Sequence, residues 1–398
     1  MRIVLFHSEI ESFNYFTDQL AGELIKRGHE PFVFDQAGLD PKRPESYAAF
    51  LDFISRKVDA VICFDGLGIR EDMYIEAWDG HDAVAVDILM DPPLRFHPTL
   101  ECHPRNYQLF CCDRDHVAYV KKYFSDTIAR VDFMPHAGVL PGDGAPVIPW
   151  EKRTYDVLFC GTYYRPESRL ARLGQIFPEG SDMMHICRLV YQTLTADSRL
   201  SVDRAVELTV KKAGLSLSRE GMKTLMRCSE EVDWAIRMYR RGQVVQTLAD
   251  GGVELYLLGR GWEDHPAAGR PHVHRIDDRV PYGETLAHMA NARINLNVMP
   301  GFKAGTHDRI FNTFLQHSLP LTDSSAWIDE HFTDGVDIAL YGLDDLERLP
   351  SMVEGFLADA PRAEAMIQKG YEKTAGNYTW SNCADRILEA VKRHRTGG

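Results

Sequence analysis

Short apolar runs of strand length alternate with segments of helical spacing along most of this 398-residue chain, and this alternation limits the possible folds. Arg2–Phe6 is strand-like, Phe13–Lys26 has helical apolar spacing, and Gly28 ends that helix. Strands separated by helices form a mostly parallel, doubly wound sheet. Further strands of this first series are expected at Pro31–Phe34, Asp59–Phe64, Ala83–Val86 and Tyr107–Cys111.

A second strand-helix series begins at Tyr155, after the proline- and glycine-rich segment Pro141–Pro149, whose composition predicts a linker. We therefore expect an N-terminal domain at 1–145 and a C-terminal domain at 146–380. Amphipathic helical patterns without strands, from about Gly174 to Arg241, interrupt the second domain and predict a helical insert. The later strands are expected at Val253–Leu258, Ile294–Val298, Leu319–Thr322 and Val336–Leu340.

Composition excludes several classes of protein. No apolar run approaches the roughly 18 residues of a membrane span, so we expect none. The eight cysteines contain no C-x-x-C pair, and together with the absence of a signal peptide pattern they favour the cytoplasm. A formal charge of −13 argues against a nucleic-acid partner, although it leaves room for a local basic pocket.

The run Asn297–Asn312, N-V-M-P-G-F-K-A-G-T-H-D-R-I-F-N, is the most informative motif in the chain. It follows a strand-like run and places a glycine-bearing loop before the start of a helix. Such loops bind anions in α/β proteins, because free N–H groups and the positive helix end face the ligand. Lys303, His307 and Arg309 add positive charge, so the sequence predicts a phosphate-bearing substrate.

The pattern N-x-x-P-x-F-x-x-G-x-H-D-R-x-F-N, continued by Leu321-Thr-Asp323, resembles the donor-site signature of spore-maturation-protein-like group 1 glycosyltransferases. Val157–Tyr163 and Leu257–Trp262 resemble the first strand and the G-x-G-W segment of that family's donor domain. The resemblance covers about Tyr155 to Asn382. It implies the glycosyltransferase B (GT-B) fold, with two Rossmann-like domains facing a cleft and a last helix, at 381–398, that crosses back to the first domain.

The resemblance implies a nucleotide-sugar donor, whose diphosphate must be stabilised as it leaves. Arg309 can form a bidentate fork with phosphate, or can instead pair with Asp308 or Glu330. The other candidate donor contacts have structural alternatives, such as helix capping by Asp308 or Asp323, a solvated Lys303, or Arg169 in place of Arg165. The candidate donor-binding residues are Gly161, Arg165, Gly259, Arg260, Lys303, His307, Asp308, Arg309, Asn312 and Asp323.

The sequence departs from the family pattern at three positions. Asn312 stands where many relatives carry the second glutamate of an E-x7-E pattern, and a ribose contact is still expected there. Ala304 replaces the first glutamate, which removes the basis for carrying over a retaining mechanism. His317 stands where the family commonly has glycine.

Candidates for the catalytic base lie in the first domain. His7 and Glu9 follow the first strand at its carboxyl end, where His or a carboxylate could take a proton from an acceptor. Asp91 and His97 lie in a long loop, and His136 closes the domain near the expected hinge. Surface or hydrogen-bonded structural roles remain the alternative for the histidines among them.

No metal or other cofactor is expected. Asp113-Arg-Asp115 matches a manganese-binding D-x-D string, but it reads better as the capped start of a helix at Asp115–Phe124. The sequence thus predicts a cytoplasmic, metal-independent glycosyltransferase that moves a hexose-like sugar to a glycan, protein or small-molecule acceptor. Alternatives are an epimerase or hydrolase of the same fold and a non-catalytic binding module. The insert could cap the domain, shape an acceptor site or form a homo-oligomer surface.

Overall fold

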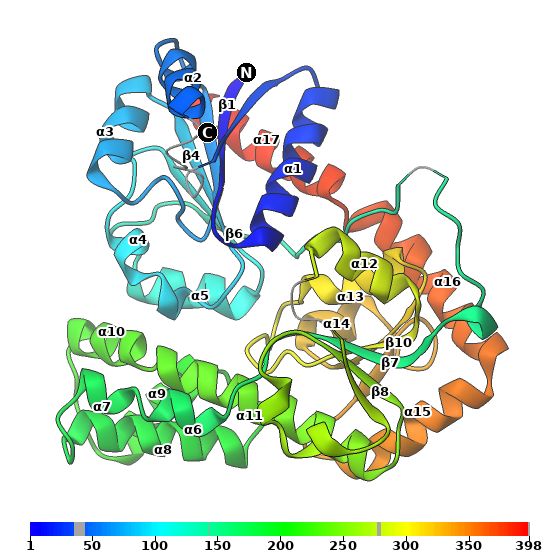
Figure 1. Ribbon diagram of the computed structural model, residues 1–398. Coiled ribbons are helices and arrows are strands. Elements are labelled where there is room, and N and C mark those ends of the chain that lie inside the picture. Colours follow the sequence, from blue (N-terminus) through cyan, green and yellow to red (C-terminus); the bar gives the residue numbers. More distant parts are fainter. Residues whose placement is uncertain (36–43, 143, 277–279, 397–398) are drawn as a thin grey trace. The chain divides into compact units, whose positions relative to one another are not determined.

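The computed structural model describes residues 1–35, 44–142, 144–276 and 280–396, so Asp143 of the expected linker lies outside it. The chain divides into two compact units, Met1–Val139 with Asn377–Gly398 and Leu140–Gly376 (Figure 1). Each unit is built on a parallel sheet with helices on its faces, as the alternating pattern predicted. The fold is thus an α/β fold of two doubly wound domains.

The first unit contains a six-stranded parallel sheet in the order β2-β1-β3-β4-β5-β6. Its three central strands, β3, β4 and β5, are buried along their whole length, as parallel strands covered on both faces should be. The last strand of the sheet, β6, was not predicted because only three residues form it. The strands are β1 Arg2–His7, β2 Glu30–Asp35, β3 Ala60–Phe64, β4 Val84–Leu89, β5 Tyr107–Cys111 and β6 Val131–Phe133.

The helices of the first unit connect these strands. The expected loop around Asp91 and His97 contains a short 3-10 turn, Pro93–Arg95, and a one-turn helix, α4. The helices are α1 Glu11–Lys26, α2 Pro44–Ile54, α3 Asp72–His81, α4 His97–Glu101, α5 Arg114–Tyr123 and α17 Trp380–Thr396.

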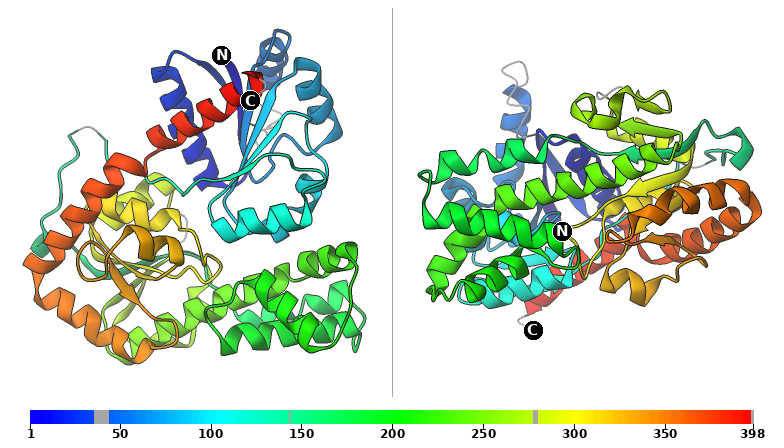
Figure 2. Two further views of the ribbon diagram at one scale, coloured as in Figure 1. Left: turned by 180° about the vertical axis from the view of Figure 1, so that it is seen from behind. Right: turned by 90° about the horizontal axis from the view of Figure 1, so that it is seen from below.

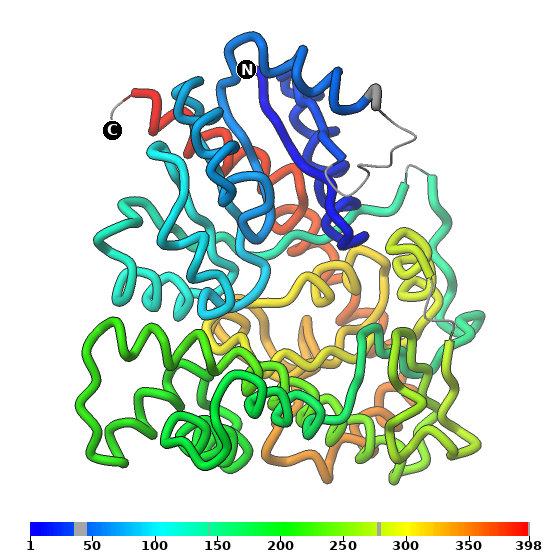
Figure 3. The backbone as a smooth tube through the Cα atoms, turned by 60° about the vertical axis from the view of Figure 1, so that its left-hand side comes forward, coloured from blue at the N-terminus to red at the C-terminus, as the bar shows by residue number. Residues whose placement is uncertain are grey.

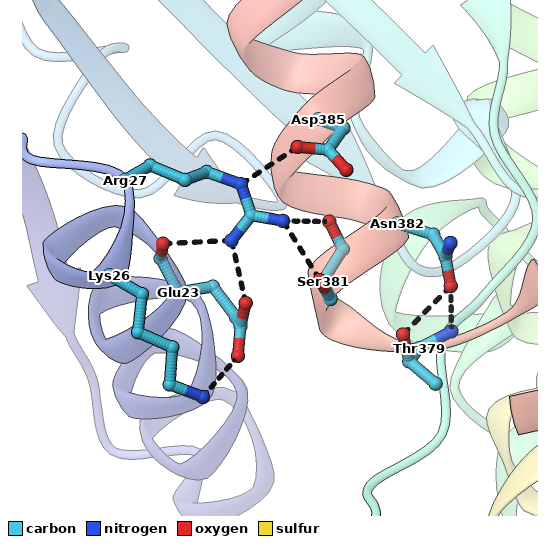
Figure 4. Close-up of polar contacts among 7 residues, drawn as sticks. All are labelled: Glu23, Lys26, Arg27, Thr379, Ser381, Asn382 and Asp385. Atoms are coloured by element: carbon cyan, nitrogen blue, oxygen red, sulfur yellow. Dashed lines mark hydrogen bonds and ion pairs between the residues drawn. The ribbon is translucent and has the colours of Figure 1, made fainter. Parts of the chain in front are cut away.

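The last helix, α17, belongs to the first unit and packs along α1 (Figure 2). Trp380 lies against Phe16, with 5.1 Å between ring centroids. Arg27 at the end of α1 fixes the polar side of this contact (Figure 4). Its guanidinium donates to Asp385 at 2.7 Å and to the hydroxyl of Ser381 at 2.8 Å. It also donates to Glu23 at 2.6 Å, so one side chain joins two helices that are far apart in sequence.

The second unit contains another six-stranded parallel sheet, in the order β12-β11-β10-β7-β8-β9. Its core joins Phe159, Leu257 and Leu296 of the sheet to Leu248 and Val353 of the covering helices. Strand β9 was not predicted, because Val273-His-Arg-Ile276 has too little apolar patterning. The strands are β7 Tyr155–Cys160, β8 Leu255–Leu258, β9 Val273–Ile276, β10 Ala292–Asn297, β11 Leu319–Asp323 and β12 Ala339–Tyr341.

The region from Gly174 to Arg241 is helical, and its helices run side by side in Figures 1 and 3. Its longest helix, α11, does not end at Arg241 but continues to Asp250, and there it buries Val244 and Leu248 against the sheet. The insert is therefore an extension of the helix that connects β7 to β8. The helices are α6 Pro166–Leu170, α7 Leu173–Ile176, α8 Asp182–Ala196, α9 Val202–Lys212, α10 Arg219–Cys228 and α11 Glu230–Asp250.

The remaining helices follow the later strands. His317, two residues after the end of α13, adopts a left-handed φ of +56°, a conformation that favours glycine. Its carbonyl accepts a hydrogen bond from the buried Arg153 at 2.6 Å, and its ring stacks on Tyr371. None of the helices that the structure describes combines the length and apolar composition of a membrane span. The helices are α12 Tyr282–Ala290, α13 Asp308–Leu315, α14 Ala326–His331, α15 Leu349–Ala358 and α16 Ala360–Asn377.

The contact between α1 and α17 predicts a loss of stability in Arg27→Ala. Removing the guanidinium breaks its bonds to Ser381 and Asp385, which should lower the free energy of unfolding by roughly 1–2 kcal/mol. Chemical denaturation followed by circular dichroism measures the change. Lys26→Ala is the matched control, because its side chain is 73% exposed and contacts only the end of Glu23. Equal losses in the two variants would show that Arg27 does not join the helices.

Candidate functional site

The second sheet changes direction between β7 and β10, which lie side by side at its centre. After β7 the chain adds β8 and β9 on one side, and after β10 it adds β11 and β12 on the other. The carboxyl ends of the strands at such a switch point form the usual ligand site of a doubly wound sheet. The loop after β7 contains Gly161, and the loop after β10 leads to α13.

The loops after β7 and β8 approach each other so closely that two glycines are required. Gly259 has a φ of +137°, and a Cβ there would lie 2.4 Å from the carbonyl oxygen of Gly161. Gly261 has a φ of +80°, and its Cβ would lie 2.0 Å from the carbonyl oxygen of Tyr163. Trp262 is buried, and its indole N–H donates to the Gly161 carbonyl at 2.7 Å. Trp262 therefore holds the loop in place.

Arg309 lies at the switch point, in the first turn of α13. Its guanidinium donates to the Asn297 side chain at the end of β10, at 2.6 Å. It lies over the ring of Phe159, 5.4 Å from the centroid, and a Cβ on Gly161 would be 3.6 Å from its Nη2. These contacts place the positive charge of Arg309 between the ends of β7 and β10, where a ligand phosphate would sit.

A polar cluster surrounds the start of α13. His307, not Asp308, is the N-cap of the helix, and Asp308 accepts hydrogen bonds from Tyr282 at 3.0 Å and Asn312 at 3.1 Å. Nδ1 of His307 lies 2.7 Å from the Asp308 carboxylate but 3.3 Å from the Arg309 amide. Burial, together with Arg309, lowers the pKa of His307, while Asp308 opposes the shift. His307 is therefore neutral near pH 7.

Asn312, the expected ribose contact, is buried beneath this cluster. Its amide donates to the hydroxyl of Tyr282 at 2.9 Å as well as to Asp308. In this arrangement Asn312 orients Asp308 and Tyr282. Its contact with a ligand stays a prediction.

Arg241 is a component of the site that the sequence did not reveal. It lies on α11, is 7% exposed, and donates to the carbonyl of Thr162 at 2.9 Å. Its guanidinium lies 5.8 Å from the centroid of the Phe159 ring, and its charge contributes to the lowered pKa of His307. Arg241 and Arg309 thus both lie over Phe159 beside the Gly161 loop. The only hint in the sequence of α11 was the pair of adjacent arginines, Arg240-Arg241, among its buried positions.

The remaining basic candidates lie in different surroundings. Arg169 is paired with Glu231 at 3.2 Å and lies over Trp234, so it is committed to the contact with α11. Arg165 is exposed at the N-cap of α6, beside a cavity of about 650 Å³. Arg260 is exposed after β8, and its carbonyl accepts from the Tyr163 N–H at 2.9 Å. For Arg165 and Arg260, contact with a ligand stays a prediction.

Lys303 and Asp323 line a second cavity, of about 400 Å³, at the ends of β11 and β12. Asp323 is 2% exposed, and its Oδ1 accepts from the Met299 N–H at 2.8 Å. Burial raises the pKa of Asp323 to about 6, although Lys303 and the Met299 N–H act in the opposite direction. Asp323 does not cap the following helix, because Ser325 is the N-cap of α14.

The candidate catalytic residues of the first unit follow the carboxyl ends of its strands. His7 contacts Asp18 at 2.8 Å, and Glu9 is exposed. Asp91 pairs with Arg95 at 3.0 Å, and His136, after β6, is buried. His97, also considered above, is buried and contacts the hydroxyl of Tyr119 at 2.6 Å, which is a structural role.

A half-buried carboxyl group beside Asp91 was missed. Asp65, after β3, has a left-handed φ of +53° and accepts from the Met90 N–H at 2.9 Å. Burial and the neighbouring Asp91 raise the pKa of Asp65 well above its usual value. Strain and a raised pKa at a sheet edge are common in functional sites. No sequence motif marks Asp65, because its neighbour Asp91 comes from another strand.

The D-x-D string has the structural role that was expected. Asp113 is the buried N-cap of α5, and its carboxylate accepts from the Asp115 N–H at 2.7 Å. Within the described ranges, no group of three or more His, Cys, Asp or Glu side chains could hold a metal ion.

Comparison with known proteins finds a sequence likeness in the C-terminal part of the chain. Residues 240–389 match a family described as "Glycosyl transferase-like". The protein is a glycosyltransferase. The matched residues include α13, the cluster around Arg309 and the cavity-lining residue Asp323. None of the curated proteins matches the sequence of this glycosyltransferase.

Solved structures match the glycosyltransferase over both units. Sucrose-phosphate synthase of Thermosynechococcus elongatus is 10% identical, with 100% of both chains covered and a TM-score of 0.56. A glycosyltransferase of Rickettsia africae is 9% identical, covering 100% of this chain and 99% of that chain, with a TM-score of 0.55. HepE of Anabaena in complex with UDP-glucose is 10% identical, with 98% and 99% covered and a TM-score of 0.52. At these identities the likeness shows the fold, which is GT-B.

The raised pKa of Asp323 predicts a specific pH dependence of stability. Because the folded pKa of about 6 exceeds the unfolded value, the ionised carboxylate destabilises the fold above pH 6, and this cost fades as the pH falls toward 4. Relative to Asp323→Asn, the wild type should therefore gain roughly 2.5 kcal/mol between pH 7 and pH 4. Urea unfolding of both proteins across this range gives the difference. A constant difference would mean that Asp323 titrates normally.

Proposed function

We propose that the enzyme transfers a hexose-like sugar from a nucleotide-sugar donor without using a metal ion. The observation that carries this proposal is the position of Arg309, whose guanidinium bonds to Asn297 and lies beside Gly161 at the switch point. Arg241 brings a second guanidinium to the same loop. Two guanidinium groups beside the switch point of a parallel sheet can bind a diphosphate, which carries the complementary charge.

The chemistry of transfer gives these cations a role. As the bond between the sugar C1 and the phosphate oxygen breaks, negative charge builds up on the leaving nucleoside diphosphate. Guanidinium groups fixed by protein contacts stabilise that charge without reorganising. Arg309 is fixed by Asn297, and Arg241 is fixed by the Thr162 carbonyl. The N-terminus of α13 adds backbone N–H groups to the same place.

The donor is proposed to be a uridine or related nucleotide sugar. Two structures with TM-scores of 0.52 and 0.55 are complexes with UDP-glucose and with UDP, which makes these nucleotides the first to test. The H-D-R-x-F-N run at His307–Asn312 further supports a place near the spore-maturation-protein-like group. We propose that Gly161, Gly259 and the Asp308 cluster contact the nucleotide.

The acceptor hydroxyl must lose a proton, and the first unit offers four candidate bases. His7, Asp91 and His136 follow the carboxyl ends of β1, β4 and β6, and Glu9 lies two residues beyond His7. Asp91 is the most strongly supported of them, because it shares its surroundings with Asp65, whose pKa is raised. We further propose a cytoplasmic enzyme, since all eight cysteines are free thiols and most are buried.

Arg309→Ala should weaken the binding of UDP or of the better-bound nucleoside diphosphate while leaving the fold intact. Losing a charge-assisted bond to phosphate should cost roughly 1.5–3 kcal/mol of binding free energy. Isothermal titration calorimetry with UDP and GDP measures the loss. Arg362→Ala, on the exposed face of α16, is the control and should bind as the wild type does. Unchanged affinity in a folded Arg309→Ala protein would remove Arg309 from the site.

Transfer should continue in the presence of excess chelator, because the guanidinium groups supply the charge that a metal ion would otherwise bring. Release of UDP from UDP-glucose, with and without EDTA, measures this, and analysis of the sugar product separates transfer from hydrolysis or epimerisation. Loss of activity with EDTA that manganese or magnesium restores would overturn the metal-independent mechanism.

A further inference from the structure

The cavity of about 400 Å³ at the ends of β11 and β12 is built jointly by the sheet and the helical insert. Ser198 and Arg199, from the turn between α8 and α9, form one wall. The hydroxyl of Ser198 donates to Asp344, in the loop after β12, at 2.8 Å. This bond ties the insert to the sheet at the rim of the cavity, which we call the Asp323 pocket.

Asp323 supplies an unused hydrogen-bond acceptor to this pocket. Its Oδ1 is bonded to the Met299 N–H, but its Oδ2 is buried and has no hydrogen-bond partner among the described residues. A buried carboxylate oxygen without a donor is costly, and such atoms in native proteins usually await a ligand or water. A ligand in the pocket could offset that cost by donating a hydrogen bond to Oδ2.

The hydroxyl groups of the pocket have their hydrogens directed elsewhere. Ser325 donates to the Gly305 carbonyl at 2.6 Å, and Tyr341 donates to the Asn297 carbonyl at 2.8 Å. Ser324 likewise donates to the carboxylate of Asp329. Each of these oxygens can therefore only accept a further hydrogen bond. A fitting ligand must bring several donor hydrogens of its own.

Charged groups of both signs line the pocket: Arg199 and Lys303, and the carboxylates of Asp323, Asp329, Asp344 and Asp345. Three of these carboxylates have partners in the chain, since Asp344 accepts from Ser198, Asp329 accepts from Ser324, and Asp345 lies 3.7 Å from Arg348. Arg199 is held by Asp197 through bonds of 2.9 and 3.0 Å, which keeps its guanidinium at the wall. Leu343 and the tyrosine ring at 341 add apolar surface. A sugar ring supplies many hydroxyl donors, carries no net charge and has one apolar face, so it is a ligand that fits this pocket.

We propose that the Asp323 pocket binds a neutral saccharide unit other than the sugar of the nucleotide donor, with Asp323 as the buried acceptor. The cavity lining includes Lys303 and Asp323, but none of the residues described around the Arg309 guanidinium. The helical insert completes the wall, so the pocket would select the saccharide part of an acceptor. This inference stands apart from the donor assignment, because free sugar alone tests it.

The test is binding of free sugars to the full-length protein in the presence of saturating UDP. Maltose, mannose, galactose and N-acetylglucosamine serve as probes, with saturation-transfer NMR to detect binding and calorimetry to measure it. At least one probe should bind. Asp323→Asn keeps the shape but turns a donor toward the ligand, so it should weaken binding by about tenfold or more. Asp344→Asn, on the exposed rim, should weaken it by a smaller factor.

Asp72→Asn is the control, because this carboxylate is exposed on α3 of the first unit and should leave sugar affinity unchanged. An unchanged far-UV circular dichroism spectrum in every variant shows that the fold is intact. Failure of all probes to bind the wild type, equal binding by Asp323→Asn, loss of sugar binding on adding UDP, or displacement of the sugar by spermidine would each overturn the proposal. Failure of UDP to bind would sink only the donor assignment.

Discussion

The close approach of the loops after β7 and β8 is the constraint on which the rest of the site depends. The backbone of Gly259 comes so near the Gly161 carbonyl that no side chain fits between them. The same carbonyl accepts from Trp262, and the next residue, Thr162, accepts from Arg241. With its carbonyl oxygens turned to these donors, the loop leaves space beside Gly161 for the Arg309 guanidinium. A side chain at position 259 would move the Gly161 loop and would therefore displace the Arg309 guanidinium.

The sequence predicts the parallel strands well, because strands covered on both faces are nearly continuous apolar runs. Strand β6 has only three residues, and β9 places His274 and Arg275 between its apolar ends, so both depend on pairing with a neighbour for their formation. The end of the insert was misplaced for another reason. The apolar spacing of α11 continues past Arg241 unchanged. Before Arg241 the helix packs on other helices of the insert, and after it the helix packs on the sheet.

The candidate site was predictable only where one continuous segment forms it. His307, Asp308 and Arg309 lie in a single strand–loop–helix motif, and the structure brings them together. Arg241 reaches the Thr162 carbonyl in the loop after β7 from a helix some 80 residues later in the sequence, and no local pattern encodes such a contact. Asp323 was recognised as a strand-end carboxylate, but its unused oxygen and raised pKa follow from burial by distant residues.

The insert is coupled to the site through two adjacent residues of α11. Arg240 donates to the carbonyls of Leu194 and Thr195 at the end of α8, at 2.9 and 3.1 Å. Arg241 donates to Thr162 in the loop beside Gly161. Because both lie on one turn of a helix that the sheet holds at its other end, a shift of α8 must strain the Thr162 contact or bend α11. An insert built as an extension of a core helix therefore has a fixed position relative to the Gly161 loop, which a loop insertion would not give.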